Sequence, residues 1–229
     1  MAELILALDL PDRTKALNML DKLGNDLKWC KIGMELFTRY GPALVEEIKN
    51  RGLSVFLDLK FYDIPHTVGR AIASAKAIGV DIVTLHCQGG VRMLAQAVEE
   101  VAGEKKEKQP RPLLFGVTVL TSFAQGEMPG ISLTPETFAM NLAQIAAQTG
   151  LDGIVCSAKE VEAIKKTYPE LLCLCPGIRP SWAQKEDQRR IATPKEAINK
   201  GADYLVIGRP ILEAQDPFSA LRTILEEMA

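Results

Sequence analysis

The chain has 229 residues, of which 47% are hydrophobic and 24% are charged, so it can bury a large core within one domain. Its formal net charge of −2 argues against the broad basic surface that nucleic acids or anionic membranes attract. No apolar stretch approaches the ~20 residues that cross a bilayer. The N-terminus lacks the pattern of a signal peptide, and the five cysteines are scattered, so we expect a reduced, cytoplasmic protein.

Short apolar segments with many β-branched residues recur along the chain and alternate with helical patterns. In chain order the predicted strands are residues 4–8, 29–33, 54–59, 82–87, 113–120, 153–157, 171–177 and 204–208. The segment 42–52 ends in a glycine, which is a helix stop signal. The segment 134–150 begins with Thr-Pro and ends in Gly, and a second Thr-Pro at 193–194 repeats that start before the last strand.

Eight strand–helix units of this spacing predict a closed (β/α)₈ TIM barrel of parallel strands. We expect residues 1–229 to form this barrel as a single domain, since no linker divides the chain. A doubly wound parallel sheet is the alternative fold. No predicted strand is followed by GxGxxG, which disfavours a dinucleotide-binding version of that alternative.

Charged residues fall at the ends of the first three predicted strands, where a barrel of this kind places its chemistry. Asp9 follows the first strand, Lys31 lies in the second, and Asp58 and Lys60 end the third. Strand alternation puts Phe56, Asp58 and Lys60 on one face and leaves an aliphatic face for the helices. Singly, each charge could be a helix cap, a solvated lysine or a buried ion pair. Three strands directing unlike charges to one place favour an active site.

The end of the chain indicates a phosphate site. Gly208 and Arg209 follow the last predicted strand, and barrels often bind phosphate in the loops after strands seven and eight. Glycine lets the backbone approach an anion, and arginine supplies a planar fork of donors. The long polar segment 176–194 is a candidate lid over the ligand, with an ordinary surface loop as the alternative.

In order along the chain, the motifs "LALDL", "KIG", "DLKFYDIPHTV", "VTVLTS", "PGIRP", "DQRR" and "VIGRPI" resemble those of the bacterial orotidine 5′-monophosphate decarboxylases. The resemblance covers essentially the whole chain, and its most specific part is "DLKFYDIP". It implies decarboxylation of orotidine 5′-monophosphate to UMP and CO₂ in de novo pyrimidine biosynthesis. It also implies that the reaction needs no cofactor and no metal.

The resemblance further assigns roles to individual residues. Lys31, Asp58, Lys60 and Asp63 would form an alternating array of charges, in which Lys60 stabilises and protonates the carbanion at C6 of the substrate. Asp63 would reach the active site of a neighbouring subunit, so that a homodimer holds two shared sites. The substrate contacts that it implies are Asp9 and Lys31 to the ribose, Ile64 and Thr67 across the interface, Thr121 and Ser122 along the pyrimidine, and Arg179, Gln188, Gly208 and Arg209 to the phosphate.

Three alternatives remain open from the sequence. Sugar-phosphate decarboxylases and aldolases of the same barrel lineage have a similar Asp-x-Lys-x-x-Asp pattern but use Mg²⁺, and "FYDIPHT" and "DQRR" favour the nucleotide enzyme. A non-catalytic nucleotide sensor is disfavoured, because a binder of a phosphate needs no carboxylates beside the base. Association with an orotate phosphoribosyltransferase is undecided. The roles of His66 and of His86, which ends the fourth predicted strand, are also undecided.

Overall fold

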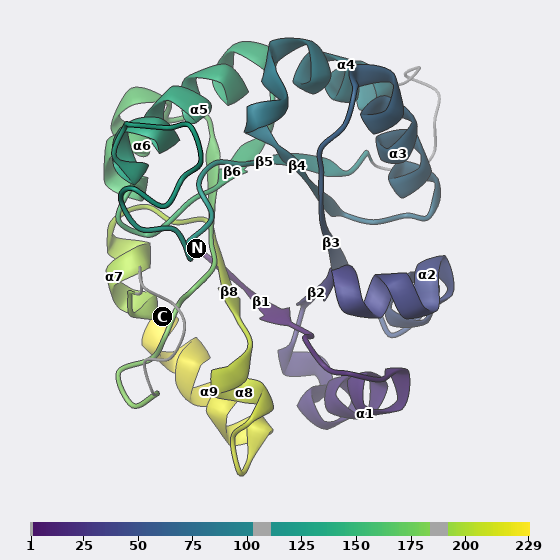
Figure 1. Ribbon diagram of the computed structural model, residues 1–229. Coiled ribbons are helices and arrows are strands. Elements are labelled where there is room, and N and C mark those ends of the chain that lie inside the picture. Colours follow the sequence, from purple (N-terminus) through teal and green to yellow (C-terminus); the bar gives the residue numbers. More distant parts are fainter. Residues whose placement is uncertain (1, 103–110, 184–191) are drawn as a thin grey trace.

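The computed structural model describes residues 2–102, 111–183 and 192–229. Within these ranges the strands close into one parallel barrel in sequence order, with β1 paired to β8 as well as to β2 (Figure 1). The predicted (β/α)₈ barrel is therefore confirmed. The strands are β1 (Glu3–Ala7), β2 (Trp29–Gly33), β3 (Ser54–Phe61), β4 (Ile82–His86), β5 (Leu113–Val117), β6 (Gly153–Val155), β7 (Leu172–Cys175) and β8 (Tyr204–Ile207).

Helices surround the barrel on its outer side (Figure 1). They are α1 (Arg13–Leu23), α2 (Met34–Lys49), α3 (Pro65–Ala77), α4 (Gly90–Ala102), α5 (Pro135–Thr149), α6 (Val161–Thr167), α7 (Pro194–Asn199), α8 (Arg209–Leu212) and α9 (Pro217–Met228), with short 3₁₀ helices η1 (Gly24–Asp26) and η2 (Cys87–Gly89). In the described part of the chain, no helix has the length and apolarity that a membrane crossing requires.

The start and stop signals read from the sequence locate α5 correctly. Thr134 caps the helix by accepting a hydrogen bond from the backbone N–H of Thr137, and Gly150 ends it in the left-handed conformation. Thr193 begins α7 with a reciprocal capping box to Glu196. These helices are defined by local side-chain chemistry, which is why the sequence alone predicts them.

The helix predicted over residues 42–52 forms the second part of a kinked helix. Helix α2 starts at Met34 and continues through Gly41 and Pro42, where Gly41 takes a non-helical backbone conformation with φ of 56°. A proline removes a helical N–H donor and normally ends or kinks a helix, which is why the sequence pattern placed the start here. The non-helical glycine divides α2 into two helical segments, and the second begins at Pro42 as predicted.

The apolar core has two parts, separated by the wall of the barrel. Inward-facing side chains of the strands, among them Phe56, Phe115 and Leu174, form a small inner cluster. Outward-facing residues such as Val55 and Leu57 pack against the helices in a much larger cluster. The alternation predicted for residues 55–60 therefore places its aliphatic face against the helices as expected.

The N-terminal end of the barrel carries a repeated ion-pair arrangement. The sequence Gly-x-Asp precedes β4, β6 and β8, and each aspartate accepts a hydrogen bond from a backbone N–H of the preceding strand while it pairs with a basic side chain. Asp152 accepts from the N–H of Leu114 at 2.8 Å and from Arg111 at 2.6 and 2.8 Å. The corresponding sets are Asp81 with Val55 and Lys49, and Asp203 with Cys173 and Lys165. This end of a barrel contributes stability rather than chemistry.

Candidate active site

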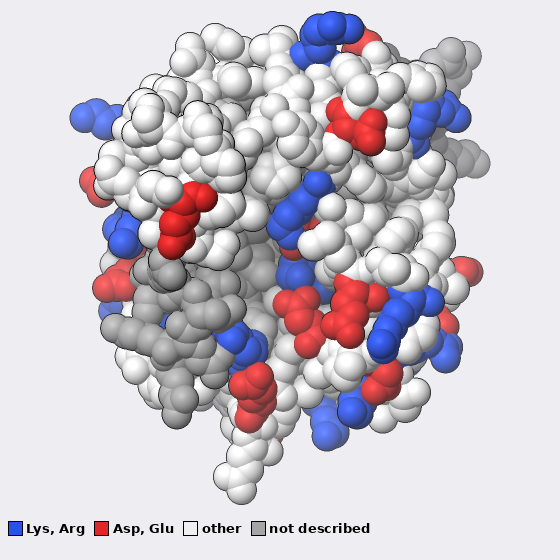
Figure 2. Space-filling model, in the orientation of Figure 1, with Lys and Arg blue, Asp and Glu red and all other residues white. Residues whose placement is uncertain are grey.

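The opposite end of the barrel, where the strands finish, contains a cavity of about 570 Å³. Figure 2 shows blue and red side chains meeting in a hollow in the middle of this face. The sequence-predicted residues that line the cavity are Asp9, Lys31, Asp58, Lys60, Thr121, Ser122, Arg179, Gly208 and Arg209. They come from the ends of β1, β2, β3, β5, β7 and β8, so barrel closure brings together residues up to 200 positions apart in the sequence.

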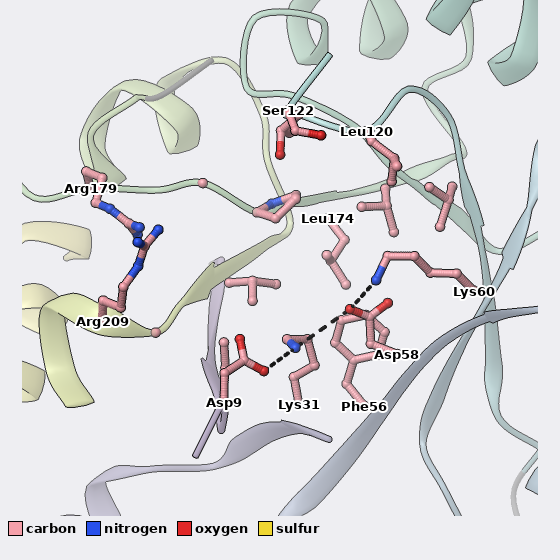
Figure 3. Close-up of a pocket in the computed structure, with 18 of the residues that line it drawn as sticks. Asp9, Lys31, Phe56, Asp58, Lys60, Leu120, Ser122, Leu174, Arg179 and Arg209 are labelled. Atoms are coloured by element: carbon pink, nitrogen blue, oxygen red, sulfur yellow. Dashed lines mark hydrogen bonds and ion pairs between the residues drawn. The ribbon is translucent and has the colours of Figure 1, made fainter. Parts of the chain in front are cut away.

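Four of these residues form a line of alternating charge, called here the charge chain: Asp9, Lys31, Asp58 and Lys60 (Figure 3). The Nζ of Lys31 lies 2.9 Å from Oδ1 of Asp9 and 3.7 Å from Oδ2 of Asp58. That same Oδ2 lies 2.8 Å from Nζ of Lys60. Lys31 and Asp58 are buried, at 8% and 9% exposure, and ions removed from water to this extent need such partners.

Local sequence makes room for the first pair of the charge chain. Gly33 ends β2 and pairs in register with Asp58 of β3. A Cβ atom at Gly33 would lie 3.1 Å from Nζ of Lys31 and 3.2 Å from Oδ1 of Asp9, closer than side chains normally approach. The glycine of the "KIG" motif therefore leaves space for the Asp9–Lys31 ion pair.

The backbone at Lys60 departs from a regular strand. The pairing of β3 with β4 shifts register between Leu57 and Phe61, and Lys60 has a left-handed φ of 53°, unusual for a residue with a side chain. The N–H of Lys60 donates to Oγ1 of Thr84 at 3.0 Å, and that hydroxyl donates to Oδ1 of Asp58 at 3.0 Å. Thr84 was not predicted from the sequence as a site residue. The feature that could have identified it is a polar residue within the apolar strand "IVTLH".

A second charged group lies at the other end of the cavity. Arg179 follows β7 and Arg209 begins α8, and the two guanidinium groups converge across the cavity from Lys60 (Figure 3). Arg179 is 7% exposed. Gly208 lies between β8 and Arg209, and a Cβ atom there would come within 3.2 Å of Ala7 Cβ. Two converging arginines suit a dianion such as a phosphate monoester.

The cavity also has an apolar wall, of which only Phe56 was placed on the inward face from the sequence. Inward-facing residues at the strand ends line it between the two charged groups: Phe56, Val117, Val155, Leu174 and Val206. Strand alternation could have predicted the other wall residues, because each lies on the inward face of its strand. Thr121 and Ser122 add hydroxyl groups beside this wall. Apolar walls with a few convergent polar groups are typical of small-molecule sites.

Three expected site residues lie outside the cavity of their own chain. Asp63, Ile64 and Thr67 follow β3, and all three are exposed, Ile64 by 66%. The carboxylate of Asp63 accepts a hydrogen bond from the N–H of Ile64 at 2.7 Å. Gln188 and the middle of the candidate lid, residues 184–191, lie outside the described residues.

His86 ends β4 close to the charge chain but does not line the cavity. Its ring lies 5.8 Å from that of Tyr62, and its buried Nδ1 has no hydrogen-bond partner among the residues that the structure describes. Burial lowers the pKa of His86, and the positive charge of Lys60 lowers it further, against an opposing effect of Asp58. We therefore infer that His86 is a neutral neighbour of the site at pH 7. His66 is exposed on α3.

The arrangement supports one kind of chemistry above others. Arginines at one end can hold an anion, and an ammonium at the other end lies beside a buried carboxylate. An ammonium fixed by a carboxylate can stabilise a developing negative charge and deliver a proton to it. Among residues 2–102, 111–183 and 192–229, no three His, Cys, Asp or Glu side chains are grouped closely enough to hold a metal ion.

Comparison with known proteins gives a consistent result. Residues 2–224 match the family model described as "Orotidine 5′-phosphate decarboxylase / HUMPS family". The chain is 46% identical over 228 residues to orotidine 5′-phosphate decarboxylase of Lawsonia intracellularis, covering 100% of both chains. It is 50% identical over 231 residues to that of Nitratidesulfovibrio vulgaris, covering 100% of this chain and 98% of the relative. The crystal structure of orotidine 5′-phosphate decarboxylase from Lactobacillus acidophilus superimposes with a TM-score of 0.88 at 32% identity, covering 100% and 99% of the two chains.

Proposed function

Because the chain belongs to the orotidine 5′-phosphate decarboxylase / HUMPS family, we propose that the charge chain is the centre at which it decarboxylates orotidine 5′-monophosphate to UMP. The enzyme acts in pyrimidine biosynthesis. We also propose that residues 1–229 form one catalytic domain. The observation that carries it is the position of the Lys60 ammonium, 2.8 Å from the buried carboxylate of Asp58 and across the cavity from two arginines (Figure 3).

The two charged ends of the cavity define how the substrate would lie. The 5′-phosphate would bind Arg179, Arg209 and the backbone at Gly208, with Gln188 as a further contact on the basis of the sequence motif. The ribose hydroxyls would contact Asp9 and Lys31, which lie between the two ends. The pyrimidine would then pack on the apolar wall beside Thr121 and Ser122, with C6 directed toward Lys60. Binding the remote phosphate supplies energy that can be used to position the reacting carbon.

In the reaction, the bond between C6 and the carboxyl carbon breaks and CO₂ leaves. The electron pair stays on C6, in an orbital that the ring does not delocalise. The ammonium of Lys60 stabilises this charge and then gives C6 a proton, and the amine later regains a proton from water. Asp58 holds the ammonium in place through the 2.8 Å contact. Crowding of the substrate carboxylate by Asp58 would add a smaller effect.

The role of Lys60 as proton donor is tested by replacing this residue. Lys60→Ala is expected to abolish nearly all turnover, while the fold survives because the Lys60 side chain is 27% exposed and lies at the cavity edge. Lys15→Ala, which removes an exposed lysine from α1, is the matched control and is expected to keep full activity. Activity is followed as loss of orotidine 5′-monophosphate absorbance in the presence of EDTA. Near-normal turnover by Lys60→Ala would refute the assigned role. Turnover of a sugar phosphate that needs added Mg²⁺ would instead favour the related sugar-phosphate enzymes.

A homodimer with shared sites is the second part of the proposal. Large apolar side chains are exposed just after three neighbouring strands: Met34 after β2, Tyr62 and Ile64 after β3, and Val91 after β4. An apolar surface of this kind is typical of a protein–protein interface. A second copy of the chain bound there would receive Asp63, Ile64 and Thr67, which the cavity of their own chain does not include.

Subunit mixing tests the shared site. Asp63→Ala and Lys60→Ala proteins are each expected to be inactive, and mixing them is expected to restore activity through hybrid dimers that contain one intact site. Subunit exchange is verified independently with differently labelled chains. Exchange without any recovery of activity would show that Asp63 does not serve the neighbouring site.

A further inference from the structure

We propose that Thr84 is a positioning residue for the reaction, because its hydroxyl holds both Asp58 and the backbone of Lys60 in their reactive arrangement. This inference rests on the role proposed above for Lys60. Thr84 lies in the middle of β4, is fully buried and does not line the cavity, so it reaches the reaction through these two neighbours.

The hydroxyl of Thr84 connects the two residues directly. It donates a hydrogen bond to Oδ1 of Asp58 at 3.0 Å and accepts one from the backbone N–H of Lys60 at 3.0 Å. A hydroxyl has one proton to donate and lone pairs to accept with, so both contacts form together. With Oδ1 bound to Thr84, the other oxygen of Asp58 is left facing Lys60 at 2.8 Å and Lys31 at 3.7 Å. The hydroxyl therefore orients the carboxylate.

The backbone at Lys60 explains why a side chain is needed at this point. Register between β3 and β4 shifts after Leu57 and resumes at Phe61, so the N–H of Lys60 pairs with a side chain of β4. Lys60 also has a φ of 53°, which is costly for a residue with a Cβ atom and persists only when its surroundings hold it. The bond from its N–H to Thr84 is one such restraint, and the backbone direction at Lys60 determines where the ammonium can reach.

Thr84→Val tests the proposal, because valine keeps the shape of threonine and removes only the hydroxyl. A displacement of about 1 Å at a reacting group can cost about a hundredfold, so we expect kcat to fall by roughly 10- to 100-fold. KM and UMP affinity should stay near wild type, since Thr84 does not contact the arginines and Lys31 keeps its shorter ion pair with Asp9 at 2.9 Å. Thr84→Ser, which restores the hydroxyl, should recover most of the lost kcat.

Thr118→Val is the matched control. Thr118 is also fully buried, on the segment after β5, and its hydroxyl donates to the carbonyl oxygen of Val155 at 2.8 Å rather than to the charge chain. Its loss should lower stability by less than Thr84→Val does, because the carbonyl of Val155 keeps the hydrogen bond from the N–H of Thr118, and kcat should be unchanged. If Thr84→Val does not fold, Thr84→Ala replaces it in the same comparison.

The outcomes separate this inference from the proposed function. A fall in kcat for Thr84→Val, with unchanged KM, rescue by serine and no effect in Thr118→Val, supports positioning by Thr84. Normal kcat in Thr84→Val alongside an inactive Lys60→Ala refutes the role of Thr84 and leaves Lys60 in place. An equal loss of kcat in both valine variants would assign the effect to lost stability and would also refute positioning.

Discussion

Asp152, the aspartate that immediately precedes β6, offers a test of how stability and chemistry are divided between the two ends of the barrel. Asp152 accepts a hydrogen bond from the N–H of Leu114 at 2.8 Å and pairs with Arg111 at 2.6 and 2.8 Å, at the end opposite the charge chain. Asp152→Ala removes both contacts. Asp152→Asn keeps an acceptor oxygen for the N–H of Leu114 and removes only the ion pair.

The two contacts differ in what they contribute. Arg111 is 46% exposed, so its pair with Asp152 is screened by water and contributes at most about 1 kcal/mol. Leu114 is 1% exposed, and leaving a buried N–H without an acceptor costs about 1–3 kcal/mol. Asp152→Ala should therefore destabilise by about 1–4 kcal/mol, and Asp152→Asn by about 1 kcal/mol or less. For a chain of this size the alanine change corresponds to a fall in Tm of roughly 2–16 °C.

Stability is measured by urea and thermal unfolding at one protein concentration, because association would make the transition concentration-dependent. Turnover of orotidine 5′-monophosphate is measured well below the unfolding transition, where both variants should keep a kcat within about twofold of wild type. A Tm for Asp152→Ala equal to that of Asp152→Asn would refute the role of the Leu114 hydrogen bond. A large loss of kcat with unchanged stability would refute the division between the two ends of the barrel.

Arg209→Ala should lower kcat/KM by about 10- to 100-fold through loss of a charge-assisted bond to the phosphate. Arg222→Ala, on the outer face of α9, is the control and should leave kcat/KM unchanged. Equal kcat/KM values for the two variants would refute the phosphate site. The pKa of His86 in the folded protein lies below the ordinary value of 6.5. The stability that neutral His86 contributes is therefore complete above pH 6.5, and it is lost as the pH falls through the pKa of the folded state. His86→Gln should accordingly flatten the acid side of a stability-against-pH curve, and an unchanged slope would contradict the lowered pKa. Burial raises the pKa of the Cys30 and Cys87 thiols to about 12, and all five cysteines are buried. The native protein should therefore resist Ellman's reagent, and the unfolded protein should react fully. Rapid reaction of the native protein would contradict the burial of the cysteines.

The sequence was sufficient to predict elements that depend on local chemistry. Thr134 and Gly150 bound α5 because a cap is made by residues within one turn of the helix. The third strand was predicted with its charged face because alternation needs only neighbouring residues. The boundaries were less accurate: the strand predicted over 113–120 ends at Val117, because the chain then leaves the barrel wall to line the cavity with Leu120.

The shape of the site depends on contacts that no local pattern contains. Alternation placed Asp58 and Lys60 on one face, but Lys60 reaches the cavity through a left-handed backbone and a register shift that involve β4. Thr84 belongs to the site only through the pairing of β3 with β4, which brings its hydroxyl to Asp58 and Lys60.

The sequence by itself thus determined the eight strand–helix units and the strand ends at which charges occur, because period, caps and turns act over a few residues. Barrel closure decided which of those ends face one another, and it brought Arg179 to Arg209 and Asp9 to Lys31. Distances between ions separated by tens of residues depend on strand register and packing across the whole barrel. For that reason the charge chain is a property of the tertiary structure.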